Sequence, residues 1–451
     1  MTEITLDAIR NCLDGQIPGA LTTVSRDGTP NIARISQVDY VDQRHVALSF
    51  QFFSKTRENV LANPHVQIDV VDPVTIAHYS LEARYLRTET AGPRFEGMKA
   101  KLAGIASQAG MSKVFRLLGA DIYEVLAIRA VPWMQRLDSP PMTDLFPLLR
   151  ASTQQLALCV DLAGLIEELL NGLENRFGLR HVMLLMHDGP GERLYTVASR
   201  GYAHSGVGSE IPIGTGVIGV AAREQCPIRI NHWTAEYAYS LAVRKSFQDT
   251  EAGKDLETEI PLPGLSMPNS QMAVPFVQGN TLLGVLYVES LEEARFSYQM
   301  EDALVVLMQQ FALVMAMLQQ STAESISSVS ASTPPDGAAG PPLRVRRYPV
   351  NDSVFIDDDY LIKGVAGAIC WKLLKDYQEL GRTEFTNREL RLDASLRLPD
   401  ISDNLEARLI LLQRRLAERC DGLAIEKTGR GRFRLCVAHP MELLECSPGA
   451  G

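Results

Sequence analysis

The stretch SDNLEARLILLQRRLAERC, residues 402–420, is the one on which the interpretation of this chain depends. Four of its leucines recur every three or four positions, so a helix would gather them on one buried side: Leu405, Leu409, Leu412 and Leu416. A neighbouring stripe of the same helix holds Asn404, Arg408, Leu411 and Arg415. The spacing therefore predicts a helix whose leucines face inward while Arg408 and Arg415 face outward.

Two further helices and a hairpin are predicted around this stretch. VFIDDD (354–359) has the character of a short strand, and YLIKGVAGAICWKLLKDYQELG (360–381) has apolar residues at helical spacing and ends at a glycine. Thr386 and Glu389 have the spacing of a capping box and begin a second helix, NRELRL. IEKTGRGRFRLCV (425–437) alternates on both sides of a glycine-rich turn, which predicts a β-hairpin.

Three helices followed by a hairpin over residues 354–437 resemble an α+β winged helix-turn-helix domain of the response-regulator type. The resemblance implies double-stranded DNA as the partner. Arginine suits bidentate contact with guanine, asparagine suits adenine, and a helix start suits phosphate. The residues expected to contact DNA are Thr386, Asn387, Arg388, Asn404, Arg408, Arg415, Arg430 and Arg432. The alternative is that these arginines form a solvated face and that the domain binds protein.

The charge of this last part differs from that of the rest. Residues 343–440 hold 18 Lys and Arg against 15 Asp and Glu, a net charge of +3; because the whole chain carries −10, the other residues carry −13. Such an asymmetry is expected where one domain meets an acidic partner. The chain as a whole is too acidic to resemble a nucleic-acid-binding protein.

Two breaks divide the chain. STAESISSVSASTPPDGAAGPP (321–342) is dominated by Ser, Ala, Gly and Pro and predicts a flexible linker. A softer boundary lies at Ser-Pro-Pro, 139–141. We therefore expect a multidomain protein with domains at residues 1–138, 145–320 and 343–440.

The middle part begins and ends with helical patterns. Apolar residues recur at helical spacing over 145–177, and EDALVVLMQQFALVMAMLQQ (301–320) predicts a long helix with an apolar face. Between them, strands alternate, and IPIGTGVIG (211–219) and GVLYV (284–288) carry a resemblance to the α/β GAF domain over about 148–318. The resemblance implies a sensor that binds a small-molecule effector beside its sheet, or that only dimerises.

The N-terminal part alternates as consecutive antiparallel strands with one short helix. GALTTVS (19–25) precedes an Asp-Gly turn, and SKTRENVLANPHV (54–66) predicts a helix that ends before Pro64. This order and the Ser-Lys-Thr-x-x-Asn-Val-Leu-x-Asn-Pro-x-Val motif resemble the pyridoxamine-phosphate-oxidase-like split barrel over about 10–132. Members of that family are usually homodimers that bind FMN in a cleft between subunits.

The barrel resemblance implies which residues would bind FMN. The phosphate positions fall on Ser54, Lys55 and Arg57, and short donors with cations at a loop-to-helix junction suit a dianionic phosphate. The positions near the flavin ring fall on Arg34, Ile35, Ser36, Ser49 and Gln51. Two alternatives remain open: an empty barrel kept for dimerisation, and another ligand such as haem or a deazaflavin.

The amino-acid composition indicates the cellular compartment of the protein. Apolar residues make up 46% and charged residues 22%, as in soluble globular proteins. No uninterrupted apolar run reaches the roughly 18 residues that cross a bilayer, and the N-terminus lacks the pattern of a signal peptide. Seven cysteines without a disulfide framework fit a reducing compartment. We expect a cytoplasmic protein without a membrane segment, and we identify neither a metal-ligand pattern nor a catalytic acid–base set.

Three functions fit these patterns. The first is a one-component, ligand- or redox-responsive transcriptional regulator, in which a homodimeric flavin-type barrel and a GAF sensor control a winged helix. The second is an FMN-dependent oxidoreductase of the pyridoxamine-phosphate-oxidase-like class with regulatory appendages. The third is a ligand-free interaction scaffold.

Overall fold

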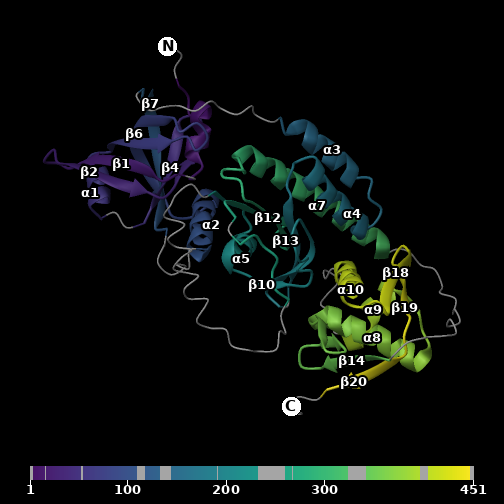
Figure 1. The fold of residues 1–451 in the computed structure, drawn as a ribbon. Coiled ribbons are helices and arrows are strands. Elements are labelled where there is room, and N and C mark those ends of the chain that lie inside the picture. Colours follow the sequence, from purple (N-terminus) through teal and green to yellow (C-terminus); the bar gives the residue numbers. More distant parts are fainter. Residues whose placement is uncertain are drawn as a thin grey trace.

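A computed structural model gives the structure. It describes residues 4–15, 17–51, 54–108, 117–132, 144–189, 191–231, 260–266, 268–323, 342–396 and 405–446. Figure 1 shows three domains that follow one another in space as they do in sequence: a strand-rich N-terminal domain, a middle domain with long helices, and a C-terminal domain.

The N-terminal domain is built on a seven-stranded sheet with the order β2-β1-β5-β6-β7-β4-β3, in which the paired strands run antiparallel. Inward-facing side chains such as Ile68 and Leu81 are fully buried between its strands. The strands are β1 (Gly19–Val24), β2 (Pro30–Ile35), β3 (Val38–Tyr40), β4 (His45–Phe50), β5 (His65–Val71), β6 (His78–Glu89) and β7 (Gly119–Ala130). The helices are η1 (Asp7–Leu13), α1 (Ser54–Ala62) and α2 (Pro93–Gln108). The predicted β-rich barrel is confirmed as a split-barrel-like sheet.

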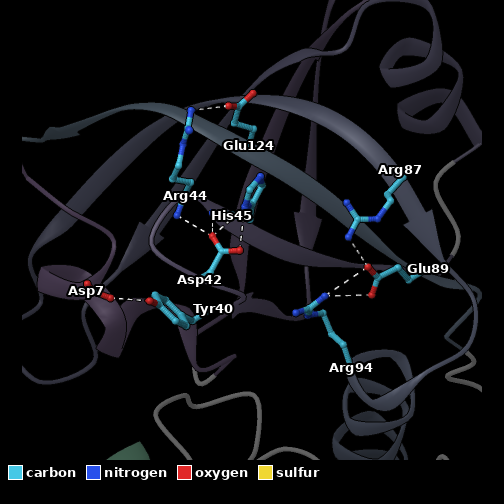
Figure 2. Close-up of polar contacts among 9 residues, drawn as sticks. All are labelled: Asp7, Tyr40, Asp42, Arg44, His45, Arg87, Glu89, Arg94 and Glu124. Atoms are coloured by element: carbon cyan, nitrogen blue, oxygen red, sulfur yellow. Dashed lines mark hydrogen bonds and ion pairs between the residues drawn. The ribbon is translucent and has the colours of Figure 1, made fainter.

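Ion pairs on the outside of this sheet orient its later strands and α2 (Figure 2). Arg44, before β4, pairs with Glu124 of β7 at 2.9 Å. Glu89, at the end of β6, accepts from Arg87 at 2.7 Å and from Arg94 of α2 at 3.1 Å. Exposed pairs of this kind contribute at most about 1 kcal/mol each, so they position α2 more than they stabilise the domain.

The middle domain contains a six-stranded sheet with the order β10-β9-β8-β13-β12-β11. Its strands are β8 (His181–Asp188), β9 (Arg193–Arg200), β10 (Glu210–Pro212), β11 (Ile228–Asn231), β12 (Ser270–Gln278) and β13 (Thr281–Ser290). Its helices are α3 (Phe146–Leu156), α4 (Leu162–Asn175), α5 (Gly216–Glu224) and α7 (Tyr298–Ala323). Helices α4 and α7 share one core with the sheet, whereas α5 packs on the opposite face beside α2 of the N-terminal domain.

Two predictions for the middle domain change in detail. The helical pattern over 145–177 belongs to two helices, because the Asp161 side chain accepts from the Gly164 N–H at 2.8 Å and begins α4 anew. Among the described residues, one helix, at Tyr298–Gln319 in α7, is long and apolar enough to cross a bilayer by length and composition. More than half of that stretch is buried inside the protein, as is usual for a core helix.

The C-terminal domain contains two small sheets around three helices. The first sheet joins β14 (Leu343–Tyr348), β15 (Ser353–Ile356), β16 (Asp359–Ile362) and β20 (Met441–Glu445), with β20 parallel to β14. The second joins β17 (Glu384–Thr386), β18 (Leu423–Gly429) and β19 (Arg432–Val437). The helices are α8 (Gly364–Leu380), α9 (Asn387–Leu392) and α10 (Leu405–Arg419), with the short η2 (Ala394–Leu396).

The second and third helices and the hairpin of this domain form close to their predicted positions, but the start of the first helix and the strands around it differ. The predicted strand at 354–359 divides between β15 and β16, and α8 starts four residues later than predicted because Tyr360–Ile362 pairs with β15. Strands β14 and β20 were not predicted. The predicted linker, 321–342, begins inside the last turn of α7, and residues 324–341 lie outside the described part of the chain.

Candidate functional site

The expected phosphate-binding positions lie at the start of α1. This helix packs against β2, where the Asn31 amide donates to the Thr56 hydroxyl at 2.9 Å. Lys55 is exposed on α1, and Arg34 is exposed on β2. The side chain of Ser54 lies outside the described residues. Of these two exposed cations, Lys55 stands where the barrel resemblance places a phosphate and Arg34 where it places the flavin ring.

Arg57 is engaged inside the domain. Its guanidinium donates to both carboxylate oxygens of Asp121, at 2.7 and 2.8 Å, and to the Thr88 hydroxyl at 2.7 Å. It also lies over the ring of Phe50, 4.8 Å from the centroid. Burial lowers the pKa of Arg57, but the Asp121 carboxylate outweighs burial and the net pKa is raised, so the guanidinium stays charged. A cofactor phosphate would have to compete with Asp121 for this arginine.

The expected ring-contacting positions meet where β2 and β4 end. The Gln51 amide donates to the Ser36 hydroxyl at 3.2 Å, and the Ser49 hydroxyl accepts from the Gln37 N–H at 3.2 Å. Ile35 is fully buried, and the cavity beside it has a volume of only about 10 Å³. That is about the smallest space that holds one water, so this cavity does not accommodate a flavin ring.

A buried carboxyl group in the middle domain is not among the site residues expected from the sequence. Glu289 of β13 accepts from the Leu265 N–H at 2.7 Å, and the Tyr287 hydroxyl lies 3.1 Å from its second oxygen. The same hydroxyl lies 2.9 Å from the side-chain oxygen of Gln271. Burial raises the pKa of Glu289. An acid inside a strand of apolar residues gives no periodic signal, so sequence patterns do not reveal this cluster.

Helix α10 holds the predicted DNA-reading arginines, and its outer face is covered by the middle domain. Arg408 is only 5% exposed; it donates to Asp188 of β8 at 2.7 Å and lies over the Tyr195 ring of β9, 4.8 Å from the centroid. The prediction that Arg408 faces outward is wrong for this structure. The reason is that a second domain, invisible to helical periodicity, packs on that face.

Arg415 is buried for a different reason. It is 3% exposed, and it donates to the backbone carbonyls of Leu361 at 3.0 Å and Tyr360 at 3.3 Å, both in β16 of its own domain. Glu418 pairs with it at 3.2 Å. Burial lowers the pKa of its guanidinium. The prediction that Arg415 is presented to DNA is also wrong here, because its guanidinium donates hydrogen bonds to backbone carbonyls of β16.

The other residues expected to contact DNA differ in how exposed they are. Thr386 caps α9 by accepting from the Glu389 N–H at 3.2 Å, which confirms the predicted N-cap, and its hydroxyl also hydrogen-bonds the Glu389 carboxylate at 2.9 Å. Asn387 is buried and Arg432 is partly buried, whereas Arg388 and Arg430 are exposed. Asn404 lies outside the described residues.

The sequence analysis missed Arg414, which lies on the covered side of α10. Its guanidinium donates to Glu167 of α4 at 2.5 Å and to the Val197 carbonyl of β9 at 2.8 Å. Arg414 stands three residues after Leu411, so these two side chains are neighbours on the surface of α10. A cleft of about 490 Å³ also opens in this domain, beside Tyr377, Thr383 and Cys436, and none of the predicted site residues is among its described lining.

Two parts of the chain match known protein families. Residues 5–129 match the family model of pyridoxamine 5′-phosphate oxidase. Residues 159–316 match the model of the GAF domain. The chain joins an oxidase-like barrel to a GAF domain. Both predicted resemblances are thereby confirmed at the level of the domain, and neither match reaches the C-terminal domain. No curated protein matches the chain.

Solved structures resemble the two matched domains only distantly. An FMN-binding protein from Syntrophomonas wolfei is 18% identical and covers 29% of this chain and 88% of its own, with a TM-score of 0.25. The GAF domain of an Acinetobacter phosphoenolpyruvate-protein phosphotransferase is 20% identical over 40% of this chain and 97% of its own, with a TM-score of 0.31. A free methionine-R-sulfoxide reductase from Neisseria meningitidis is 18% identical over 40% and 96%, also at 0.31.

Proposed function

We propose that the chain is a ligand-responsive regulator whose C-terminal domain is a winged helix that binds double-stranded DNA. The observation that carries the proposal is the order α8, β17, α9, α10, β18, β19, with β17 paired to β19. Three helices with a hairpin that closes onto the short strand between the first two make the compact core from which a winged helix presents its third helix. The oxidase-like barrel and the GAF domain then form the sensing part.

The hairpin of the C-terminal domain supports this assignment. Phe385 of β17 stacks on Phe433 of β19, 5.8 Å between centroids, and fixes the hairpin to the start of α9. The turn of the hairpin carries Arg430, which is exposed, and Arg434 on β19 is exposed with Glu384 as its partner. Cations at a hairpin tip suit backbone phosphates, which position a protein on DNA without reading its sequence.

DNA binding by the full-length chain tests the function. We expect it to bind a duplex from upstream of its own gene more tightly than an unrelated duplex, by about a thousandfold if the binding is typical of specific regulators. The affinity should fall steeply as salt rises, because phosphate contacts release counterions. Fluorescence anisotropy titrations at several salt concentrations measure both effects. Equal affinity for the two duplexes would contradict the proposal.

For the barrel we propose FMN at the interface of a homodimer. The donor set fits a flavin phosphate: Lys55 is an exposed cation at the start of α1, and the first N–H groups of that helix are free of helical partners. Arg34 is an exposed cation on β2, at a position expected to lie near the flavin ring. The cavity beside Ile35 is too small for the ring, which favours a site that a second subunit completes. Bound FMN would supply redox chemistry, and this chain's residues would hold its phosphate and exclude water from one side.

Flavin affinity tests the barrel assignment. Lys55→Ala and Arg34→Ala are each expected to weaken FMN binding about tenfold, because the first removes a charge-assisted contact to the phosphate and the second removes a cation beside the flavin ring. Lys99→Ala removes an exposed cation of α2 that pairs with Glu96 and serves as the control. Quenching of FMN fluorescence measures the affinity. An unchanged affinity in both variants, or no binding by the parent protein, overturns the assignment.

An FMN-dependent oxidoreductase is the second candidate, favoured by the match of residues 5–129 to an oxidase family. A measurement of catalytic turnover distinguishes the oxidoreductase from the regulator. Steady-state turnover of reduced flavin or of a pyridoxamine-type substrate would support it, whereas a bound but idle flavin supports the regulator.

A further inference from the structure

We infer that the acidic surface of the GAF domain occupies the DNA-binding side of α10, so that this structure is the inactive state of the regulator. The inference rests on the proposed function. It assigns to the GAF domain a second role, as a competitor of nucleic acid for the same basic side chains.

Four ion pairs join described residues of the two domains, and they share one polarity. Arg408 pairs with Asp188 at 2.7 Å, Arg414 with Glu167 at 2.5 Å, Lys427 with Asp161 at 2.8 Å, and Lys363 with Glu210 at 3.2 Å. In each of these pairs the base belongs to the C-terminal domain and the acid to the GAF domain. The GAF acids therefore contact the basic C-terminal domain as an anionic partner would. This contact accounts for the difference in net charge between the C-terminal domain and the rest of the chain.

The contact covers one side of α10 and also reaches the hairpin. Arg408 and Arg414 lie two turns apart on α10, whereas Lys427 lies on β18 of the hairpin. A winged helix contacts DNA through its third helix and its hairpin. The GAF acids reach both elements at once. Arg408 is buried beneath them, so a duplex cannot contact it while the two domains are in contact, whereas Lys427 is 40% exposed and would have to exchange Asp161 for a phosphate.

Apolar packing holds the same contact. Leu411 is only 4% exposed, and it lies beside Gly208 in the loop between β9 and β10. The buried core on the α4 and α7 face of the GAF sheet continues without a break into the core of the C-terminal domain. Separation of the domains therefore exposes apolar surface as well as breaking ion pairs, and both costs favour the covered state.

The GAF strands that contact α10 and its domain belong to the central sheet of the proposed sensor. Asp188 ends β8, Val197 lies within β9, and Glu210 begins β10. These strands form one half of the GAF sheet, and their opposite face packs against α5. A ligand that binds the two arrangements of this sheet edge with different affinity would shift the balance between covered and uncovered α10.

The covered state lowers the apparent DNA affinity. Only the uncovered fraction binds, so the apparent dissociation constant equals the intrinsic one divided by that fraction. The Asp188→Asn, Glu167→Gln double variant removes two GAF acids and leaves the basic residues of α10 intact. We expect it to bind the upstream duplex about tenfold more tightly than the parent, because each substitution leaves a partly buried guanidinium without its carboxylate in the covered state.

Glu174→Gln is the matched control. Glu174 lies on α4, as Glu167 does, and both pair with Arg200, at 3.1 and 3.0 Å. Only Glu167 also reaches Arg414. The control should therefore keep the parent's affinity.

Titration of the parent, the double variant and the Glu174→Gln control with both duplexes tests the covered state separately from the proposed DNA-binding function. Tighter binding by the double variant alone supports the covered state. Sequence-selective binding with equal affinity in all three proteins overturns the inference and leaves the DNA-binding function standing. Failure of all three to distinguish the upstream duplex from an unrelated one overturns the function, and the inference with it.

Discussion

Replacing Arg229 by methionine is expected to lower the free energy of unfolding by about 3–5 kcal/mol and to loosen the barrel from the GAF domain. The Arg229 side chain is 3% exposed. It pairs with Glu301 of α7 at 2.8 Å and with Asp14, which follows η1 of the barrel, at 3.1 Å. It also donates to the Phe296 carbonyl at 3.2 Å. Methionine has a similar length, so the variant removes the charge and hydrogen bonds with little loss of volume.

The cost arises from the acids that remain. Asp14 is 9% exposed and Glu301 is 16% exposed, and without Arg229 both carboxylates lose their hydrogen-bonded cation while the charge of the partly buried Lys101 remains nearby. Burial raises the pKa of Asp14, and the Arg229 charge is the largest influence that opposes it. In the variant this pKa rises further. A carboxyl whose folded pKa is raised loses stability as pH rises through that pKa, so the deficit should be larger at pH 8 than at pH 5.

Urea unfolding of the full-length chain at both pH values checks this prediction. Arg223→Met is the control, because Arg223 is an arginine of α5 that is 48% exposed and pairs only with the adjacent Glu224 among the described contacts. Its replacement should change the free energy of unfolding by less than about 0.5 kcal/mol. A loss below about 1 kcal/mol in Arg229→Met, or a loss that does not depend on pH, contradicts the account of this site.

The domains follow from the sequence because each carries its own local signals. The N-cap at Thr386 begins α9 where it is predicted, and the glycine-rich turn near Arg430 separates β18 from β19. The alternation before and after the Asp-Gly turn is found in β1 and β2. Turn chemistry and periodicity within a segment are short-range properties, so sequence patterns expose them.

The partners of charged side chains do not follow from the sequence. Arg408 finds Asp188, which lies 220 positions earlier, and Arg57 finds Asp121 across the barrel. Periodicity distinguishes the inner face of a helix from the outer face, but it does not reveal that another domain covers the outer face of α10. Strand β20 was missed for the same reason, because it is defined by pairing with the distant β14.

The second large effect is expected at Arg408, once α10 is uncovered. In the Asp188→Asn, Glu167→Gln background, Arg408→Ala should weaken binding to the upstream duplex by about 10- to 100-fold, as loss of a bidentate arginine–base contact does. Binding to an unrelated duplex should weaken much less, because a base contact carries sequence information that phosphate contacts lack. Arg419→Ala, at the exposed end of the same helix, should affect both duplexes alike.

Anisotropy titration of these variants with the two duplexes is the most direct test of whether one arginine serves both the GAF acid and the DNA. The account predicts that Arg408→Ala reduces the ratio of specific to non-specific affinity at least tenfold while Arg419→Ala leaves that ratio unchanged. If the ratio is the same with Arg408 and with alanine at that position, α10 does not read DNA, and the regulator assignment is contradicted.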